Sequence, residues 1–505
     1  MTMKTFHRSF PVLVALCMAL SSWSISAQTK KWVGTWSTGV QLVESSNTPP
    51  SPGLTNNTLR QVVCVSIGGD TLRVKFSNDF STSACTINSA TLAVSTGKST
   101  INTSTLKQLT FNGSTSITMN ADSAVISDPI AFNLTPRMKL AITIYFGQTS
   151  STVTGHPGSR TTSYLVTGKQ DTAAAFSVID TVSHWYALST IDVWTSSPAA
   201  SVAILGNSIT DGRGSITDSQ DRWPDLLSKR LLANSATAQV GVLNMGIGGN
   251  CVLSFSSGDL GPYGVSRYQR DILNQNGASW VIIFEGVNDI GVVTTAAEAT
   301  LVADSLINAY KQMIAGAHAQ NMKVYGATIM PFNGNSYYNQ YSESCRSTVN
   351  QWIRTGGFYD SIIDFDKITR SATDSTKLKF ASFQNDGLHP SESGYQLMAD
   401  SVHLDLFTPT AVTVKDVTDK KGNVWGNIHA NHANGITRVT FEIPREAFVS
   451  LKVHSILGKE IIELAGKRFS PGRHTVEFKS GNIAKGMYLF SLKADKLSAS
   501  GVMIY

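Results

Sequence analysis

The sequence is poor in charged residues and has no long apolar run. Charged residues make up 15% of the 505 residues, whereas hydrophobic residues make up 42%. This composition excludes a mostly disordered chain, and the length predicts roughly three domains of about 150 residues each. The longest strongly apolar run, residues 10–20, is shorter than the roughly 20 residues that a bilayer-spanning helix needs. We therefore expect no membrane span.

Two further absences argue against nucleic-acid binding and against a zinc site. The sequence has no stripe of basic and aromatic residues of the kind that nucleic-acid-binding proteins carry. Most of the formal net charge of +6 comes from residues 426–505, which hold 11 Lys and Arg against 6 Asp and Glu, and we interpret this excess as a solvated basic surface. No Cys and His cluster has the spacing of a zinc site. We expect no nucleic-acid partner, no metal and no organic cofactor.

The N-terminus predicts a secretory signal peptide over residues 1–27. Lys4 and Arg8 form its basic region, residues 10–20 its apolar region, and small residues lead to cleavage after Ala27. Cys17 does not fit a lipidation site, because the preceding residue is a bulky leucine. The mature protein is therefore expected outside the cell or at its surface.

Few cysteines remain after this signal. Export permits disulfides, and the pair that the sequence favours is Cys64 with Cys85, because both fall in one predicted domain. The sequence leaves the connectivity open. The four remaining cysteines are Cys64, Cys85, Cys251 and Cys345.

Residues 28–197 have the pattern of an antiparallel β-sandwich. Apolar residues alternate with polar ones between turns rich in Gly, Asn and Ser, which is typical of half-buried strands. Two such runs contain Leu72, Val74 and Phe76, and Leu140, Ile142, Ile144 and Phe146.

Residues 198–408 change to a pattern of compact apolar runs separated by helical segments. Such runs suit strands that are covered on both faces, and their alternation with helices predicts a three-layer, flavodoxin-like α/β domain with a parallel sheet. The predicted strands are 201–205, 240–245, 280–285, 322–330 and 361–364, and the predicted helices begin near 223 or span 298–320, 342–354 and 392–406. Residues 409–427 are polar and charged, as in a linker, and 428–505 predict a small β-sandwich with strands at 439–443, 449–455, 474–478 and 488–492.

Ser208 stands directly after the first strand of the α/β segment. Ligands in open α/β sheets bind at the carboxyl ends of the strands, so this serine has a favoured position. A serine hydroxyl needs an adjacent base to act as a nucleophile. The surrounding sequence is not the Gly-x-Ser-x-Gly elbow, which disfavours an ordinary α/β-hydrolase. Taken alone, Ser208 is more readily interpreted as a turn residue.

Asp386 and His389 lie three residues apart near the end of the same segment. In a turn, the carboxylate can hold one ring nitrogen of the histidine and leave the other facing a serine. The alternative is an ordinary surface loop.

Two more loops follow predicted strands. The glycine-rich residues 244–250 lack the lysine of a phosphate-binding loop, yet they can present a backbone N–H to an oxyanion. Asn288 follows the third strand and could donate its side-chain amide to the same oxyanion. Either loop alone could be a tight turn.

Together, these four features in this order resemble the SGNH, or GDSL-type, hydrolase superfamily over residues 199–407. The resemblance implies that Ser208 is the nucleophile, His389 the base and Asp386 the residue that orients His389. It further implies an oxyanion hole formed by the backbone N–H groups of Ser208 and Gly249 and the side chain of Asn288. Gly249 is preferred over the neighbouring glycine because family members place this glycine before a polar residue.

The flanking domains carry resemblances of their own. The N-terminal motifs at 32–36 and 59–61 resemble the β domain that precedes the catalytic domain in some secreted bacterial members. The C-terminal motifs at 449–453, 457–459, 471–474 and 486–489 resemble type IX secretion sorting domains, which implies contact with export machinery. A carbohydrate-binding module or a spacer is the alternative.

One residue departs from the family pattern. The first block usually reads Gly-Asp-Ser, whereas here Asn207 precedes the serine. The resemblance implies a serine ester hydrolase, and export, accessory β domains and low charge favour removal of O-acetyl groups from plant cell-wall polysaccharide or oligosaccharide. The alternatives are a lipase or arylesterase acting on small or lipid esters, and a non-catalytic carbohydrate-binding adhesin.

Overall fold

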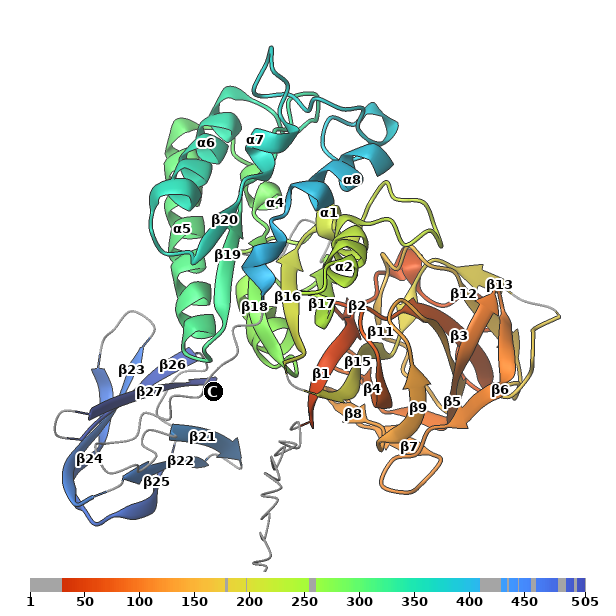
Figure 1. The fold of residues 1–505 in the computed structure, drawn as a ribbon, viewed down its shortest axis with the longest axis horizontal. Helices are drawn as coiled ribbons and strands as arrows, with labels where there is room; N and C mark the ends of the chain where they lie inside the picture. The colour runs from red at the N-terminus through yellow and green to blue at the C-terminus, as the bar shows by residue number, and fades with distance from the viewer. Residues whose placement is uncertain are drawn as a thin grey trace, which may run out of the picture.

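The computed structural model describes three regions of folded chain (Figure 1). The predicted signal peptide and the predicted linker at 409–427 lie outside the described residues, as do parts of the C-terminal motifs at 457–459 and 486. The described residues are 30–177, 180–196, 198–253, 260–408, 428–433, 436–443, 445–455, 460–479, 487–494 and 497–504.

The N-terminal region is β-rich, as predicted. Its strand pairs are antiparallel, and two larger sheets follow the orders β13-β12-β3-β10-β5-β6 and β1-β15-β4-β8, with β7 beside β5 and β9 beside β4; β14-β11-β2 form a third. In β4, Leu72, Val74 and Phe76 are fully buried while the residues between them, Arg73 and Lys75, are partly exposed, so the alternation does mark the core face. The bounds are β1 Lys30–Ser37, β2 Gln41–Leu42, β3 Asn57–Cys64, β4 Gly69–Ser77, β5 Cys85–Gly97, β6 Thr100–Gln108, β7 Ile117–Met119, β8 Ala124–Ile126, β9 Ile130–Leu134, β10 Lys139–Phe146, β11 Thr154–His156, β12 Ser163–Thr167, β13 Asp180–Val182, β14 Trp185–Tyr186 and β15 Leu188–Ser196.

The expected disulfide between Cys64 and Cys85 is wrong. Cys64 ends β3 and Cys85 begins β5, and β10 lies between these strands in the sheet. Two strand spacings amount to roughly 10 Å, whereas a disulfide needs Cα atoms within about 7 Å. Both thiols are free and buried, as are those of Cys251 and Cys345.

The central region holds a five-stranded parallel sheet, which confirms the predicted α/β domain. Its order, β17-β16-β18-β19-β20, places the first strand inside the sheet, between the second and the third. Every residue of β16 and β17 is buried, because both faces of these strands are covered. The bounds are β16 Ala200–Gly206, β17 Val240–Gly246, β18 Ala278–Phe284, β19 Lys323–Ala327 and β20 Ser361–Ile363.

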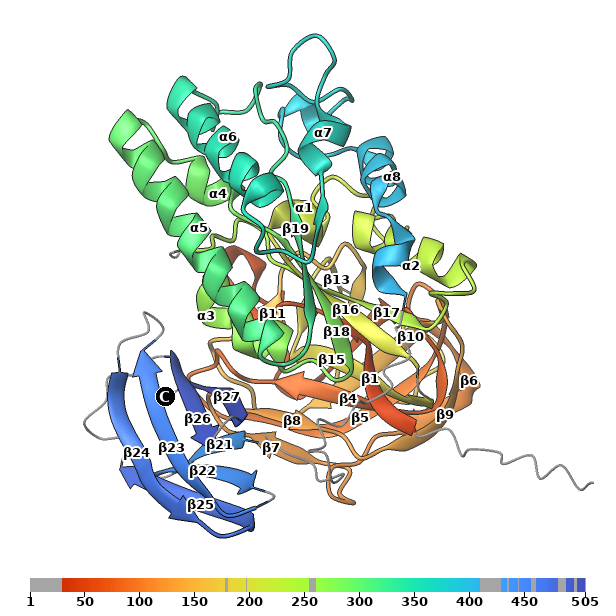
Figure 2. The same ribbon diagram turned by 60° about the vertical axis from the view of Figure 1, so that its left-hand side comes forward.

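Helices cover the two faces of this sheet. Figures 1 and 2 show α5 and α6 on one side of the sheet and α2 and α8 on the other. Pro224 opens α2, and Thr295 and Glu298 form a capping box that begins α5. The bounds are α1 Ser208–Asp211, α2 Trp223–Ala233, α3 Gly264–Tyr268, α4 Val287–Ile290, α5 Ala296–His318, α6 Gln340–Thr355, α7 Phe365–Thr369 and α8 Glu392–Ser401, with short 3-10 or π segments at Ser45–Asn47, Gln269–Leu273, Phe383–Asn385 and Leu404–Phe407.

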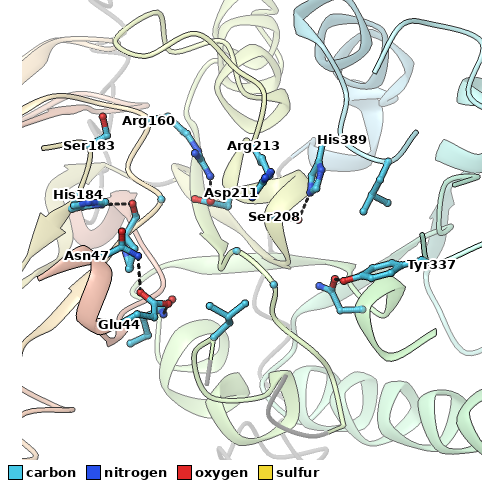
Figure 3. Close-up of a pocket in the computed structure, with 18 residues that line it drawn as sticks. Glu44, Asn47, Arg160, Ser183, His184, Ser208, Asp211, Arg213, Tyr337 and His389 are labelled. Atoms are coloured by element: carbon cyan, nitrogen blue, oxygen red, sulfur yellow. Dashed lines mark hydrogen bonds and ion pairs between the residues drawn. The ribbon is translucent and has the colours of Figure 1, made fainter. Parts of the chain in front are cut away.

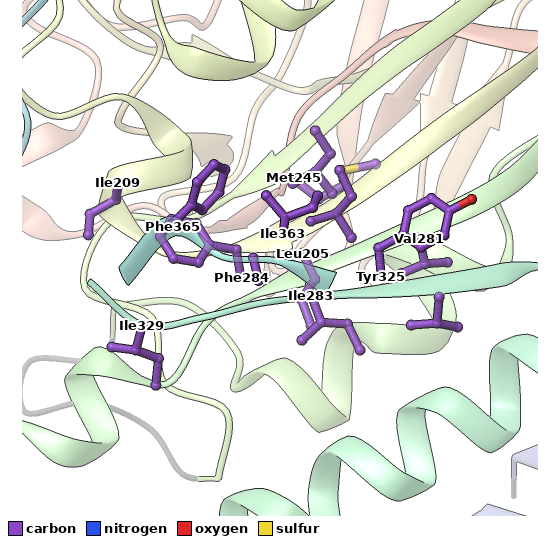
Figure 4. Packing of buried hydrophobic residues seen from close by; sticks show 14 of the residues in the cluster. Leu205, Ile209, Met245, Val281, Ile283, Phe284, Tyr325, Ile329, Ile363 and Phe365 are labelled. Atoms are coloured by element: carbon purple, nitrogen blue, oxygen red, sulfur yellow. The ribbon is translucent and has the colours of Figure 1, made fainter. Parts of the chain in front are cut away.

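A single apolar core lies between the sheet and its helices. Figure 4 shows Leu205 and Ile283 from neighbouring strands with Phe284 and Phe365 beside them. The rings of Phe284 and Phe365 meet edge to face with centroids 4.9 Å apart. This packing fixes the ends of β16 and β18, from which the loops of the site emerge.

The N-terminal region packs against β17, the edge strand of the parallel sheet. Ser66 Oγ accepts a hydrogen bond from the backbone N–H of Val242 at 3.0 Å, and the N–H of Gly34 donates to the carbonyl of Asn276 at 2.8 Å. A Cβ on Gly241 would lie 2.5 Å from the carbonyl oxygen of Gly34, so glycine permits this close approach. The edge of the sheet is thereby covered.

The C-terminal region is again antiparallel β structure. Its two sheets follow the orders β21-β22-β25 and β24-β23-β26-β27. Val439, Phe441, Val449, Leu451 and Phe490 belong to its buried core. The bounds are β21 Ile428–Ala433, β22 Ile436–Ile443, β23 Ala447–Ser455, β24 Glu460–Phe469, β25 Gly472–Lys479, β26 Met487–Ala494 and β27 Leu497–Ile504. Among the described helices of the whole chain, none has the length and apolar character needed to cross a membrane.

Candidate active site

Ser208 lies at the carboxyl end of β16, in the first turn of α1. The side chain of Asn207 accepts a hydrogen bond from the N–H of Ile209 at 3.1 Å and so caps this short helix. An Asp side chain could make the same cap, so the departure at Asn207 preserves the turn while removing a negative charge. A Cβ on Gly206 would lie 2.3 Å from Thr210 Oγ1, which explains the glycine just before the turn.

Ser208, His389 and Asp386 form a continuous hydrogen-bond chain, of which Figure 3 shows the contact between Ser208 and His389. Ser208 Oγ lies 2.9 Å from His389 Nε2, and His389 Nδ1 lies 2.6 Å from Asp386 Oδ2. The other carboxylate oxygen of Asp386 accepts from the backbone N–H groups of Leu388 and His389, each at 2.9 Å. Because Nδ1 donates to the carboxylate, Nε2 of a neutral ring is free to accept the serine proton.

The electrostatics of this chain favour a neutral histidine. Burial lowers the pKa of His389 below its ordinary value of 6.5, although Asp386 opposes this shift. Burial by itself would raise the pKa of Asp386, but the hydrogen bonds from His389 and Leu388 outweigh it and lower that pKa. At neutral pH the site therefore holds a charged Asp386 beside an unprotonated His389.

The two candidate oxyanion donors lie on the same cavity as Ser208. Gly249 follows β17 with a φ of 73°, and a Cβ there would lie 2.2 Å from Leu260 Cδ1. Asn288 lies in α4, after β18. The cavity, of about 500 Å³, is lined by Ser208, His389, Gly249 and Asn288, and Gly248 lines it as well. The ends of the parallel strands thus bring Ser208, Gly249 and Asn288 together, and the loop before α8 adds His389, through which Asp386 reaches the site.

Tyr337 is a residue of the site that the sequence did not reveal. Its hydroxyl donates to Asn288 Oδ1 at 3.1 Å, and Asn288 Nδ2 donates to the carbonyl of Asn250 at 2.7 Å. Because the oxygen of the Asn288 amide accepts from Tyr337 and one N–H donates to Asn250, the orientation of the amide is fixed. The second N–H of Nδ2 stays available for another acceptor. No motif could have indicated this pair, since the partners are 49 residues apart.

Arg267 is a second such residue, and it lies behind the site. Its fully buried guanidinium donates to the carbonyls of Gly206 at 3.0 Å and Met245 at 2.6 Å, and to Asn250 Oδ1 at 2.8 Å. It also pairs with Asp271 at 3.2 Å and Glu285 at 3.3 Å. One side chain therefore ties together the ends of β16 and β17 and the glycine loop.

A third contribution comes from the N-terminal region, at Asp211. This residue ends α1, the helix that begins with Ser208, and its carboxylate pairs with His156 Nε2 at 2.8 Å and with Arg160 Nη2 at 2.7 Å. Burial by itself would raise the pKa of Asp211, but Arg160 and His156 together lower it. His156 is in turn held by the carbonyl of Gly39 at 2.8 Å.

The other histidine near the end of the domain lies outside the candidate site. This residue, His403, is exposed and does not line the cavity. Within the part of the chain that the structure describes, no group of three or more His, Cys, Asp and Glu side chains could hold a metal ion.

Comparison with known proteins identifies the central domain. Residues 204–397 match the model of the GDSL-like Lipase/Acylhydrolase family, so this part of the chain is a GDSL-type hydrolase domain, as the motifs predicted. A search of curated proteins gave no match.

Solved structures similar to the chain include three GDSL-type or related hydrolases. A GDSL-like lipase from Bacteroides thetaiotaomicron is 17% identical, covers 40% of this chain and 84% of its own, and has a TM-score of 0.29. A lipase/acylhydrolase from Enterococcus faecalis is 19% identical, covers 42% and 100%, and has a TM-score of 0.30. A carbohydrate acetylesterase from Sinorhizobium meliloti is 14% identical, covers 41% and 97%, and has a TM-score of 0.32.

Proposed function

We propose that the protein is a secreted serine carboxylic-ester hydrolase that removes O-acetyl groups from plant cell-wall polysaccharide. The observation that carries the proposal is the chain from Asp386 through His389 to Ser208, which has the distances and the protonation of a serine-hydrolase triad. The GDSL-type domain at 204–397 supports the same chemistry.

In the first half of the reaction, Ser208 Oγ attacks the ester carbonyl carbon and His389 Nε2 takes the hydroxyl proton. The carbonyl π bond opens and its oxygen becomes an oxyanion, which the N–H groups of Ser208 and Gly249 and the amide of Asn288 stabilise. Each such donor contributes about 2.7–4 kcal/mol. The intermediate collapses, the C–O bond to the alcohol breaks, and His389 gives its proton to the leaving oxygen.

In the second half, water replaces the alcohol. His389 takes a proton from the water as its oxygen attacks the acyl carbon, and the same donors stabilise the second oxyanion. Collapse breaks the bond to Ser208 Oγ, which regains its proton from His389. Acetate leaves, and Asp386 keeps its charge throughout, orienting the ring and stabilising the imidazolium.

The cavity lining favours a carbohydrate ester over a lipid ester. Its residues include Glu44, Asn47, Arg160 and Arg213, and a long acyl chain would have to lie against these polar groups. A lipase or arylesterase acting on small or lipid esters is the alternative. The adhesin alternative is less well supported, because an inactive binder has no need of the aligned chain at Ser208.

Export and the role of the C-terminal domain belong to the proposal as well. The signal-like residues 1–27 support a secreted or cell-surface location. The C-terminal β domain would serve in sorting by export machinery, with carbohydrate binding or spacing as the alternative role.

The test is acetate release from acetylated xylan, pectin, xyloglucan and mannan by the full chain. We expect release from at least one of them, at least a hundred-fold faster than with a folded Ser208→Ala variant. A chain-length series of 4-nitrophenyl esters separates an acetylesterase from a lipase. Equal acetate release by the wild type and Ser208→Ala would contradict the proposed function.

A further inference from the structure

The cavity around Ser208 has two walls from different domains. One wall comes from the central domain and includes Tyr337 and Leu388. The other comes from the N-terminal region, and Figure 3 shows it opposite Tyr337, with His184, Asn47 and Glu44 on the far side of Ser208. The residues of this second wall are Gln41, Glu44, Asn47, Pro157, Gly158, Arg160, Ser183 and His184.

The N-terminal wall is held firmly against the catalytic helix α1. The carboxylate of Asp211, in α1, pairs with His156 and Arg160, which belong to the segment that forms the wall. A Cβ on Gly158 would lie 2.1 Å from Asp211 Oδ2, so the backbone of the wall touches the carboxylate where only glycine fits. The wall is therefore a fixed part of the site.

The polar groups of this wall are oriented and keep hydrogen-bonding capacity. The Glu44 carboxylate accepts from Gln41 Nε2 at 2.6 Å and from Asn47 Nδ2 at 3.0 Å, which leaves further lone pairs. His184 Nδ1 contacts the carbonyl of Pro157 and must donate to it, so Nε2 of the neutral ring is an acceptor. No described residue hydrogen-bonds to His184 Nε2, and the Arg160 side chain, whose Nη2 donates to Asp211, remains 29% exposed.

The two walls differ in what they can bind. An acetyl group offers one methyl and needs an apolar surface, which Leu388 and the ring of Tyr337 provide. The N-terminal wall combines acceptors at Glu44 and His184 with a donor at Arg160. A hydroxyl group donates and accepts at once, so a polyhydroxylated ligand matches this mixed set better than an aliphatic or aromatic one.

We propose that the N-terminal β domain forms the subsite for the alcohol part of the ester, and that this part is a sugar residue bound through its free hydroxyl groups by Glu44, His184 and Arg160. The inference rests on the proposed esterase function and goes beyond it, because it places substrate selection in a domain other than the one that holds the triad. The acyl group then lies toward Tyr337 and Leu388.

The test compares two acetate esters that share an acyl group and differ in the alcohol. We would measure kcat/KM for an acetylated xylo-oligosaccharide and for 4-nitrophenyl acetate, whose alcohol has no further hydroxyl. The variants are Glu44→Gln and His184→Phe, with His318→Phe as the control, since His318 ends α5 away from the cavity. Melting temperatures of all variants report on folding.

We expect the ratio of the two kcat/KM values, oligosaccharide over aryl ester, to fall about ten-fold in each cavity variant and to stay constant in the control, because a hydrogen bond to a charged or well-oriented group is lost. An unchanged ratio in Glu44→Gln and His184→Phe would overturn the subsite, as would equal losses on both esters. If wild-type enzyme hydrolyses neither ester, the proposed function itself fails, which is a separate result.

Discussion

At the scale of single residues, the protonation of His389 decides whether Ser208 can react. Burial depresses the pKa of His389 below 6.5, and the charge of Asp386 limits that depression. Arg213 and Arg160 add a smaller depression of their own, because a second positive charge nearby disfavours the imidazolium. A neutral base is therefore available throughout the neutral range.

The first prediction follows from this balance. The acidic limb of kcat/KM against pH should have its midpoint below pH 6.5, because activity is lost only when His389 binds a proton. Asp386→Asn removes the group that raises the pKa, so the limb should move to lower pH while the plateau falls by roughly 10²–10⁴-fold. Steady-state kinetics from pH 4.5 to 9 measure both effects. A limb that moves to higher pH would contradict the assignment of Asp386.

The second prediction concerns Asn288 and Tyr337. Asn288→Ala should lower kcat by roughly 10²–10³-fold with a smaller effect on KM, because its donor acts on developing charge. Tyr337→Phe removes only the contact that orients the amide, so kcat should fall by about ten-fold or less. The melting temperature serves as the control readout: a lower melting temperature with unchanged kcat would give both residues a structural role only.

The sequence anticipates the residues that follow strands better than those that support them. Ser208, Gly249 and Asn288 each come after an apolar strand, and parallel strands bring such positions to one edge. Tyr337 and Arg267 have no such marker, because their partners are distant in sequence and join only through the fold. The same limit applies to Cys64 and Cys85: their location in one domain did not reveal that a third strand lies between their strands in the sheet.

At the scale of secondary-structure elements, Arg267 connects the strand ends that carry the site. It lies in α3 (Gly264–Tyr268), and its charge is balanced by Asp271 and Glu285 in a fully buried cluster. Burial raises the pKa of Glu285 to about 7, although Arg267 opposes this shift. Loss of the guanidinium would leave Glu285 without the cation it pairs with, whereas Asp271 would keep Arg270 at 2.6 Å.

The third prediction is that Arg267→Met destabilises the protein by about 3–5 kcal/mol, the usual cost of breaking a buried ion pair from one side. Activity should fall with stability, since the ends of β16 and β17 lose their common donor. The control is Arg438→Met, which removes an exposed pair with Glu477 and should cost about 1 kcal/mol or less. Urea unfolding of both variants gives the comparison; equal stability losses would show that Arg267 has no special role.

Strands and helices with a strong periodic pattern could be predicted from the sequence, but the residues at which they end were harder to predict. The five strands of the parallel sheet follow apolar runs, and β16 and β17 are buried along their whole length. The helix predicted over 392–406 instead ends at Ser401 and gives way to a separate short helix, Leu404–Phe407. Arg230 donates to the carbonyls of Ala399 and Val402, a tertiary contact that satisfies the helix end and that no local pattern reveals.

At the scale of the whole molecule, the two flanking domains differ in their relation to the site. The N-terminal β domain supplies a wall of the cavity and holds Asp211 through His156 and Arg160. The residues that line the cavity include none of those that the structure describes between 428 and 505. The sequence indicated three domains but gave no sign that the first one enters the site.

The fourth prediction is that deleting residues 428–505 leaves esterase activity. The shortened protein should be soluble and keep kcat/KM within about two-fold on 4-nitrophenyl acetate, because every residue of the candidate site precedes the deletion.

The counterpart experiment, deletion of residues 28–197, should yield no active soluble protein, because it exposes β17 and leaves the buried Asp211 unpaired. Loss of activity in a C-terminal deletion that remains folded would place part of the site in the last domain.

The account depends above all on Ser208 being an activated nucleophile, and covalent trapping tests this most directly. The full-length protein would be treated with a fluorophosphonate, which reacts with serines activated by a neighbouring base, and the labelled peptide would be located by mass spectrometry. We predict a single phosphonyl group on Ser208, none in Ser208→Ala, and labelling slowed at least a hundred-fold in His389→Ala, whose serine lacks its base. A folded wild-type protein that takes no label, or that is labelled at another serine, would contradict the account.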